Sequence, residues 1–94
     1  MPGELSLTQL RTEIDRIDRE LFALIAQRMA LAGEIGNHKR DRGLPIRDPV
    51  REAQLKARLK EFATGVLEPR HVEELAAVLI RISRDLQAPG AEGP

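Results

Sequence analysis

Residues 7–44, LTQLRTEIDRIDRELFALIAQRMALAGEIGNHKRDRGL, decide the fold of this 94-residue chain. Apolar side chains recur along this stretch at alternating steps of three and four, which predicts one long amphipathic helix with a heptad seam. The seam comprises Leu7, Leu10, Ile14, Ile17, Leu21, Leu24, Leu31 and Ile35, and Arg28 stands in its one non-apolar position. No proline interrupts the pattern. Gly33 and Gly36 are tolerated within it at a cost of about 1 kcal/mol each relative to alanine.

Local signals predict where the helices begin and end. Ser6 and Gln9 fit a capping box at the start of the first helix. Gly43 follows a basic last turn and fits the left-handed residue that terminates a helix. Asp48 and Pro49 fit the N-cap and first position of a second helix.

The rest of the chain predicts two shorter helices. The second helix carries the apolar residues Leu55, Leu59, Phe62 and Val66 and is expected to end at Thr64-Gly65. The third begins near Pro69 and carries Val72, Leu75, Leu79, Ile82 and Leu86. The predicted fold is therefore an all-α domain of three helices over residues 1–88. Residues 89–94 are rich in Pro and Gly and are expected to be a disordered tail or a linker.

Composition excludes several classes of function. Lys plus Arg and Asp plus Glu both number 15, and this neutral balance disfavours a nucleic-acid-binding protein. No run of 18 apolar residues predicts a membrane span, and the first residues do not fit a secretory signal, so we expect a cytoplasmic protein. The chain has no Cys, and its two His do not make a metal site.

The length of the first helix predicts a homodimer. Residues 7–40 would form a helix about 51 Å long, whereas a compact chain of this size is about 32 Å across. Half of the seam would be bare in a monomer, and a bare apolar stripe of that size indicates a partner. A symmetric dimer in which the long helices cross and fill one another's bundle satisfies this requirement.

Two cations on the first helix suggest a small-anion site. Arg28 replaces an apolar seam residue, and a buried guanidinium needs an anion because burying it unpaired is very costly. A structural ion pair with Asp or Glu of another helix is the alternative. Lys39 lies 11 residues further along, only about 20° from the direction of Arg28, so both side chains can lean toward one anion. Lys39 can also be an ordinary cation at a helix C-terminus.

Two further groups of polar residues lie on the other helices. Asp48, Arg51 and Glu52 open the second helix, where free backbone N–H groups and an Arg fork suit a carboxylate. Capping and solvent exposure explain the same three residues without a ligand. Ser83 and Gln87 are four residues apart and share one face of the third helix, either as part of a site or as a polar boundary pair.

The ordered set of these residues resembles the all-α chorismate mutases of the shikimate pathway. The resemblance covers about residues 5–88. It rests on Leu10-Arg11, Ile14-Asp15, Ile17-Asp18, Leu21, Leu24, Arg28, Ile35-Gly36, Lys39, residues 43–52, Ser83 and Gln87. Each piece is a weak signal, but their order is specific. The resemblance implies the rearrangement of chorismate to prephenate without a metal or cofactor, in active sites inside the bundle of an intertwined dimer.

The resemblance also implies a role for each site residue. Arg28 and Arg51 would bind substrate carboxylates together with Arg11 of the other protomer, and Ser83 would assist at a carboxylate. Lys39 and Gln87 would donate to the ether oxygen of the breaking bond. Glu52 and the backbone at Asp48 would hold the ring hydroxyl. Helix geometry supports the partner role of Arg11 independently, because Arg11 and Arg28 lie about 25 Å apart along one helix.

Three rival functions differ in a testable feature. An isochorismate-pyruvate lyase would share the carboxylate clamps, but the residues Asp48, Arg51 and Glu52 resemble the mutases specifically. A non-catalytic regulatory or dimerisation domain would carry Leu or Ile in the position of Arg28. Neutral charge and scarce aromatics disfavour a nucleic-acid-binding dimer. Fusion to, or association with, another shikimate-pathway enzyme is compatible with a linker after Gln87.

Overall fold

The computed structural model describes residues 3–63 and 65–88, and these form three helices and no strand. Helix α1 spans Leu7–Asp41, and its capping box is confirmed. The Ser6 hydroxyl oxygen accepts from the Gln9 backbone N–H at 3.1 Å, and Gln9 Oε1 accepts from the Ser6 N–H at 2.8 Å. Gly43 adopts a φ of +66°, a left-handed conformation that favours glycine, so its predicted terminating role is also confirmed.

The predicted starts of the other two helices are confirmed as well. Helix α2 spans Pro49–Phe62, with Asp48 as the N-cap, and helix α3 spans Pro69–Gln87. Val66, the last residue of the apolar stripe expected on the second helix, lies beyond the end of α2 and is 90% exposed. The expected tail, 89–94, lies outside the described residues.

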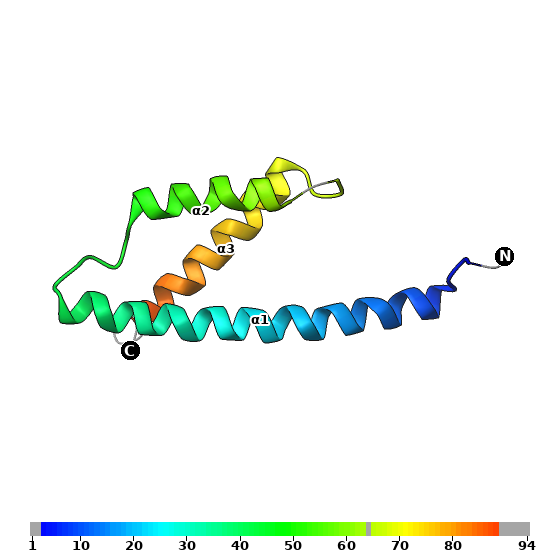
Figure 1. The fold of residues 1–94 in the computed structure, drawn as a ribbon, viewed down its shortest axis with the longest axis horizontal. Helices are drawn as coiled ribbons and strands as arrows, with labels where there is room; N and C mark the ends of the chain where they lie inside the picture. Colours follow the sequence, from blue (N-terminus) through cyan, green and yellow to red (C-terminus); the bar gives the residue numbers. More distant parts are fainter. Residues whose placement is uncertain (1–2, 64, 89–94) are drawn as a thin grey trace.

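Helix α3 crosses diagonally between α1 and α2 and packs on both (Figure 1). The N-terminal half of α1 projects beyond the other two helices (Figure 1). The chain measures 61 × 26 × 21 Å and has a radius of gyration of 17.3 Å, whereas a compact chain of this length would have about 12 Å. The predicted overshoot of the first helix is therefore present.

The core of the single chain is small and lies where α1 and α3 cross. Its buried residues are Met29, Ala32 and Gly36 on α1 and Val72, Ala76, Ile80 and Ser83 on α3. Gly36 permits the crossing, because a Cβ atom at this position would lie 2.5 Å from the Cα atom of Gln87. The close approach fixes the end of α3 against the last turns of α1.

Most of the heptad seam does not enter this core. All eight apolar seam residues of α1 remain between 47% and 62% exposed. On α3 the buried face runs through Val72, Ala76 and Ile80, whereas Leu75 and Leu86 of the expected stripe remain exposed. The stripe fails to match the buried face because α3 is apolar on more than one side, and Leu75, Val78 and Leu86 stay exposed.

Within the described ranges, the helices all fall short of the length and apolar character that crossing a bilayer requires.

Candidate active site

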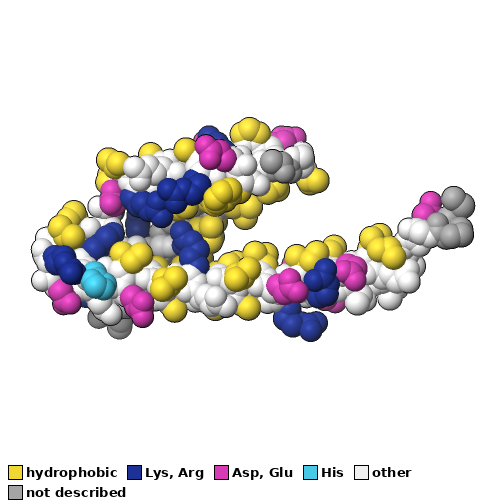
Figure 2. Space-filling view, viewed as in Figure 1, with side chains coloured by type: hydrophobic (Ala, Val, Ile, Leu, Met, Phe, Trp, Pro, Cys, Tyr) yellow, Lys and Arg dark blue, Asp and Glu magenta, His cyan; other side chains and the backbone are white. Residues whose placement is uncertain are grey.

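A cavity of about 380 Å³ lies among the C-terminal half of α1, the connection to α2, and helices α2 and α3. Figure 2 shows Lys and Arg side chains gathered in the hollow where α2 faces α1. The lining residues are Arg28, Leu31, Ala32, Ile35, Lys39, Ile46, Asp48, Arg51, Glu52, Leu55, Ile80, Ser83, Arg84 and Gln87. Seven of the eight predicted site residues are therefore brought together, and Arg11 is the exception.

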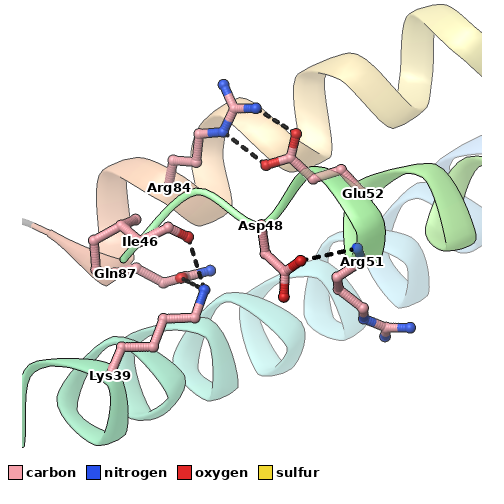
Figure 3. Close-up of polar contacts among 7 residues, drawn as sticks. All are labelled: Lys39, Ile46, Asp48, Arg51, Glu52, Arg84 and Gln87. Carbon is pink, nitrogen blue, oxygen red and sulfur yellow. Dashed lines mark hydrogen bonds and ion pairs between the residues drawn. The ribbon is translucent and has the colours of Figure 1, made fainter. Parts of the chain in front are cut away.

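Lys39 and Gln87 meet at one end of the cavity (Figure 3). The Lys39 Nζ donates at 2.7 Å to the Gln87 Oε1 and at 2.7 Å to the carbonyl oxygen of Ile46. An ammonium group has three N–H donors, so one remains available to a ligand. Because Gln87 uses its oxygen toward Lys39, its amide nitrogen is free to donate. The end of the cavity therefore offers two kinds of hydrogen-bond donor.

Arg28 is half-buried and points from α1 toward α3. Its Nη1 donates to the Ser83 hydroxyl oxygen at 2.7 Å, and that hydroxyl contacts the Met29 sulfur at 3.6 Å. The alternative of a structural ion pair for Arg28 is not present among residues 3–63 and 65–88. A guanidinium has five N–H donors. Most of the Arg28 fork thus remains free for a carboxylate.

The first turn of α2 forms a second wall. The Asp48 Oδ1 accepts from the Arg51 backbone N–H at 3.0 Å, so the carboxylate caps the helix as the sequence predicted (Figure 3). Arg51 makes no ion pair within the described part of the chain, and it is among the residues that line the cavity. Capping and ligand binding are therefore compatible at this turn, because they use different atoms.

Sequence reasoning did not single out Arg84. The Arg84 Nε donates to the Glu52 Oε2 at 3.0 Å, and its Nη2 donates to the Oε1 (Figure 3). The hydrogen bond from Arg84 holds the pKa of Glu52 below its ordinary value, although burial opposes the shift. A signal was available, because Arg84 precedes Gln87 by three residues and such positions share a helix face.

Arg11 lies on the exposed, projecting arm of α1 and does not line the cavity. Arg11 thus lies too far along α1 to reach the cavity of its own chain, as helix geometry predicts. Whether a partner chain receives it stays a prediction.

The net charge of the cavity suits a small dianion. Its cations are Arg28, Lys39, Arg51 and Arg84, and its anions are Asp48 and Glu52. Four positive and two negative side chains leave an excess of two positive charges. Within the described residues, no three His, Asp or Glu side chains gather in a group that could hold a metal ion.

The family model described as chorismate mutase type II matches residues 10–88. The chain belongs to this family. The matched span contains α2, α3, all of α1 except its first three residues, and every residue of the cavity. The family resemblance expected from the sequence is therefore confirmed, and with it the all-helical fold class.

Several curated proteins are similar to this chorismate mutase type II chain. The T-protein of Haemophilus influenzae is 39% identical over 79 residues, which cover 83% of this chain and 21% of that protein. The chorismate mutase of Methanocaldococcus jannaschii is 38% identical over 56 residues, 60% of this chain and 57% of that protein. The bifunctional chorismate mutase/prephenate dehydratase of Escherichia coli K12 is 42% identical over 59 residues, which cover 63% of this chain and 15% of that protein. The chain thus spans about a fifth of the length of the T-protein.

Proposed function

We propose that this chain catalyses the rearrangement of chorismate to prephenate in the biosynthesis of phenylalanine and tyrosine. The observation that carries the proposal is the convergence of Lys39 and Gln87, each with a free donor, at one end of a cationic cavity. Membership of the chorismate mutase type II family supports the same reaction. Substrate and product are isomers: one C–O bond breaks and one C–C bond forms in a single concerted step.

The cationic side chains would select the compact reactive conformer of the substrate. Chorismate carries two carboxylates, and the cavity carries an excess of two positive charges. Among the described residues Arg28 and Arg51 have no ion-pair partner. The Ser83 hydroxyl accepts from Arg28 at 2.7 Å and can turn its O–H from the Met29 sulfur toward the same carboxylate. Holding both carboxylates at fixed points brings the reacting carbons together. Pre-organisation of this kind can remove a large part of an activation barrier.

The pair at the end of the cavity would stabilise the transition state. Negative charge builds on the ether oxygen as the C–O bond lengthens. The remaining N–H of Lys39 and the amide nitrogen of Gln87 are fixed donors for that charge, and such donors contribute more in the transition state than in the ground state. No proton needs to move, so neither group has to titrate during the reaction.

Glu52 and the backbone of Asp48 would bind the ring hydroxyl. The carboxylate of Glu52 accepts hydrogen bonds only, so it suits a hydroxyl donor. This role gives the acidic wall of the cavity a function in a site that otherwise recognises negative charge.

We further propose that two chains form an intertwined homodimer in which Arg11 of each completes the site of the other. The chain exposes 7602 Å², whereas a compact protein of its mass would expose about 5,400 Å². The excess, about 2,200 Å² per chain, is comparable with the area that obligate homodimers bury. The exposed seam of α1 supplies apolar surface for this interface.

The activity is tested by following the loss of chorismate absorbance with the purified chain and identifying the product. Lys39→Met is expected to lower kcat by about 100-fold or more, because one fixed donor is lost. Lys56→Met is the matched control, since Lys56 is exposed and outside the cavity, and it should retain full activity. Conversion of isochorismate to salicylate instead of chorismate to prephenate would identify a lyase. A folded wild-type dimer that consumes neither compound would identify a non-catalytic domain.

The shared site is tested by mixing two inactive variants, Arg11→Ala and Arg28→Leu. Only one site of each mixed dimer would contain both arginines, and half of the dimers would be mixed after re-equilibration. Half of the sites in half of the dimers gives about one quarter of wild-type activity. Failure of the mixture to recover any activity, although mixed dimers are detected by mass spectrometry, would refute the exchange of Arg11.

The names of the relatives support a coupled partner. The Escherichia coli relative is named for a second activity, prephenate dehydratase. We propose that this chain likewise works fused to, or associated with, another enzyme of the shikimate pathway.

A further inference from the structure

The ion pair between Glu52 and Arg84 joins α2 to α3 at the wall of the cavity. Both side chains line the cavity, and they are 20% and 34% exposed, respectively. The Arg84 Nε donates to the Glu52 Oε2 at 3.0 Å, and the Nη2 donates to Oε1, so the guanidinium binds both carboxylate oxygens. Among the ion pairs of the described residues, this is the one with the least exposed side chains.

A bidentate contact restricts the orientation of the carboxylate more than a single hydrogen bond does. Parallel hydrogen bonds from one guanidinium fix the plane and the rotation of a carboxylate. Each carboxylate oxygen has about two acceptor positions, so one on each oxygen remains free. Glu52 is therefore held in one orientation while it can still accept from a ligand.

The charges around Glu52 come from every neighbouring element. Arg84 approaches from α3, Arg28 and Lys39 line the same cavity from α1, and Arg51 lies on the same helix. Arg47 and Asp48 precede that helix; the charge of Arg47 and the backbone of Asp48 lower the pKa of Glu52, but the hydrogen bond from Arg84 lowers it most. Arg84 is thus the main group that lowers the pKa of this carboxyl.

We propose that Arg84 is a positioning residue, which holds Glu52 oriented so that its free acceptor positions receive the hydroxyl of the substrate. This inference rests on the proposed function, because it assumes a substrate hydroxyl at Glu52. Arg84 acts through Glu52 and does not contact the reacting atoms. The pair also cancels the charge of Glu52 toward a dianionic substrate, which an unpaired carboxylate would repel.

Arg84→Gln is the decisive variant. The hydroxyl contact exists in the bound substrate and in the transition state alike, so its loss should raise KM by about tenfold while kcat stays within about twofold. Without Arg84 the pKa of Glu52 rises. Because the ionised form is required, the acid limb of the kcat/KM profile should move to higher pH.

Two further variants separate positioning from a general effect on folding. Arg84→Lys keeps the charge but loses the fork, so its acid limb should stay near that of the wild type and its KM should be intermediate. Arg81→Gln is the matched control, because Arg81 lies one turn earlier on α3, outside the cavity, and contacts only Asp85 at 3.7 Å among the ion pairs described. Its KM, kcat and pH profile should equal those of the wild type.

A titration of Glu52 in the substrate-free protein gives a readout that does not depend on activity. The carboxyl carbon, followed by NMR, should titrate at higher pH in Arg84→Gln than in the wild type and in Arg81→Gln. A raised KM with an unmoved acid limb and an unmoved Glu52 titration would make Arg84 a direct substrate contact and overturn the inference. An active wild type whose Arg84→Gln variant matches Arg81→Gln would overturn it too. A wild type that leaves chorismate unchanged removes the proposed function and this inference together.

Discussion

Replacement of Gly36 by alanine is expected to reduce activity far more than stability, and the same replacement at Gly33 provides the matched comparison. Both glycines lie inside α1, so alanine adds about 1 kcal/mol of helix propensity at either position. They differ in what the new Cβ would meet. At Gly33 the nearest atom is the carbonyl oxygen of Leu86 at 3.8 Å, an ordinary contact. At Gly36 the Cβ would lie 2.5 Å from the Gln87 Cα and 2.8 Å from its carbonyl carbon.

The distances at Gly36 determine the expected magnitudes. Carbon atoms in contact are about 3.5–4.0 Å apart, so the end of α3 must retreat by about 1 Å. Overpacking of this kind costs about 1–3 kcal/mol, which the gain in helix propensity partly offsets, leaving a net destabilisation of about 0–2 kcal/mol. The same retreat carries the amide of Gln87 away from its position beside Lys39. A displacement of about 1 Å near the reacting atoms can reduce the rate by about 100-fold.

Urea unfolding and steady-state turnover of chorismate measure the two effects separately. Gly33→Ala should unfold at a higher urea concentration than the wild type and turn over at the wild-type rate. Gly36→Ala should unfold at a similar or lower urea concentration and lose about 100-fold in kcat. If Gly36→Ala retains the wild-type kcat, the close approach of the two backbones does not position Gln87 for catalysis, and the reasoning is refuted.

Three more outcomes are expected. Gln87→Glu should be active only at acidic pH, because a carboxylate cannot donate to the ether oxygen and the protonated acid can; full turnover at pH 8 would contradict the assigned donor. Arg28→Leu should raise the midpoint of thermal unfolding, because it removes a half-buried charge from the seam, and should abolish turnover; an active variant would exclude Arg28 from substrate binding. The pKa of Glu52 is lowered by Arg84 and that of Glu73 by Lys60, so unfolding free energy should fall as the pH drops below the ordinary glutamate value of 4.5; urea midpoints measured from pH 6 to pH 3 that do not decrease would contradict this.

Sequence reasoning succeeded where the deciding interaction is local. Ser6 and Gln9 cap α1 through contacts three residues apart, and the N-cap at Asp48 is equally local. Lys39 and Arg28 reach one cavity because the periodicity of a single helix determines their directions. Each of these predictions needed only the geometry of one element.

The missed features depend on the angle at which α3 crosses the other helices. The contact between Arg84 and Glu52 joins residues 32 positions apart, and no pattern within either helix specifies it. Within its own helix Gly36 is only a cost to stability, because its benefit comes from the backbone of Gln87 on another helix.

The position of Gln87 as the last helical residue has a consequence for the temperature range of the protein. Terminal turns fray with free energies far below that of global unfolding. A donor at such a position is held by tertiary contacts, here the side chain of Lys39 at 2.7 Å and a hydrogen bond from Arg40 to the Gln87 carbonyl. Heating should therefore open the last turn of α3 while the bundle is still folded. The proposed activity would then be lost at a lower temperature than the one at which the bundle unfolds.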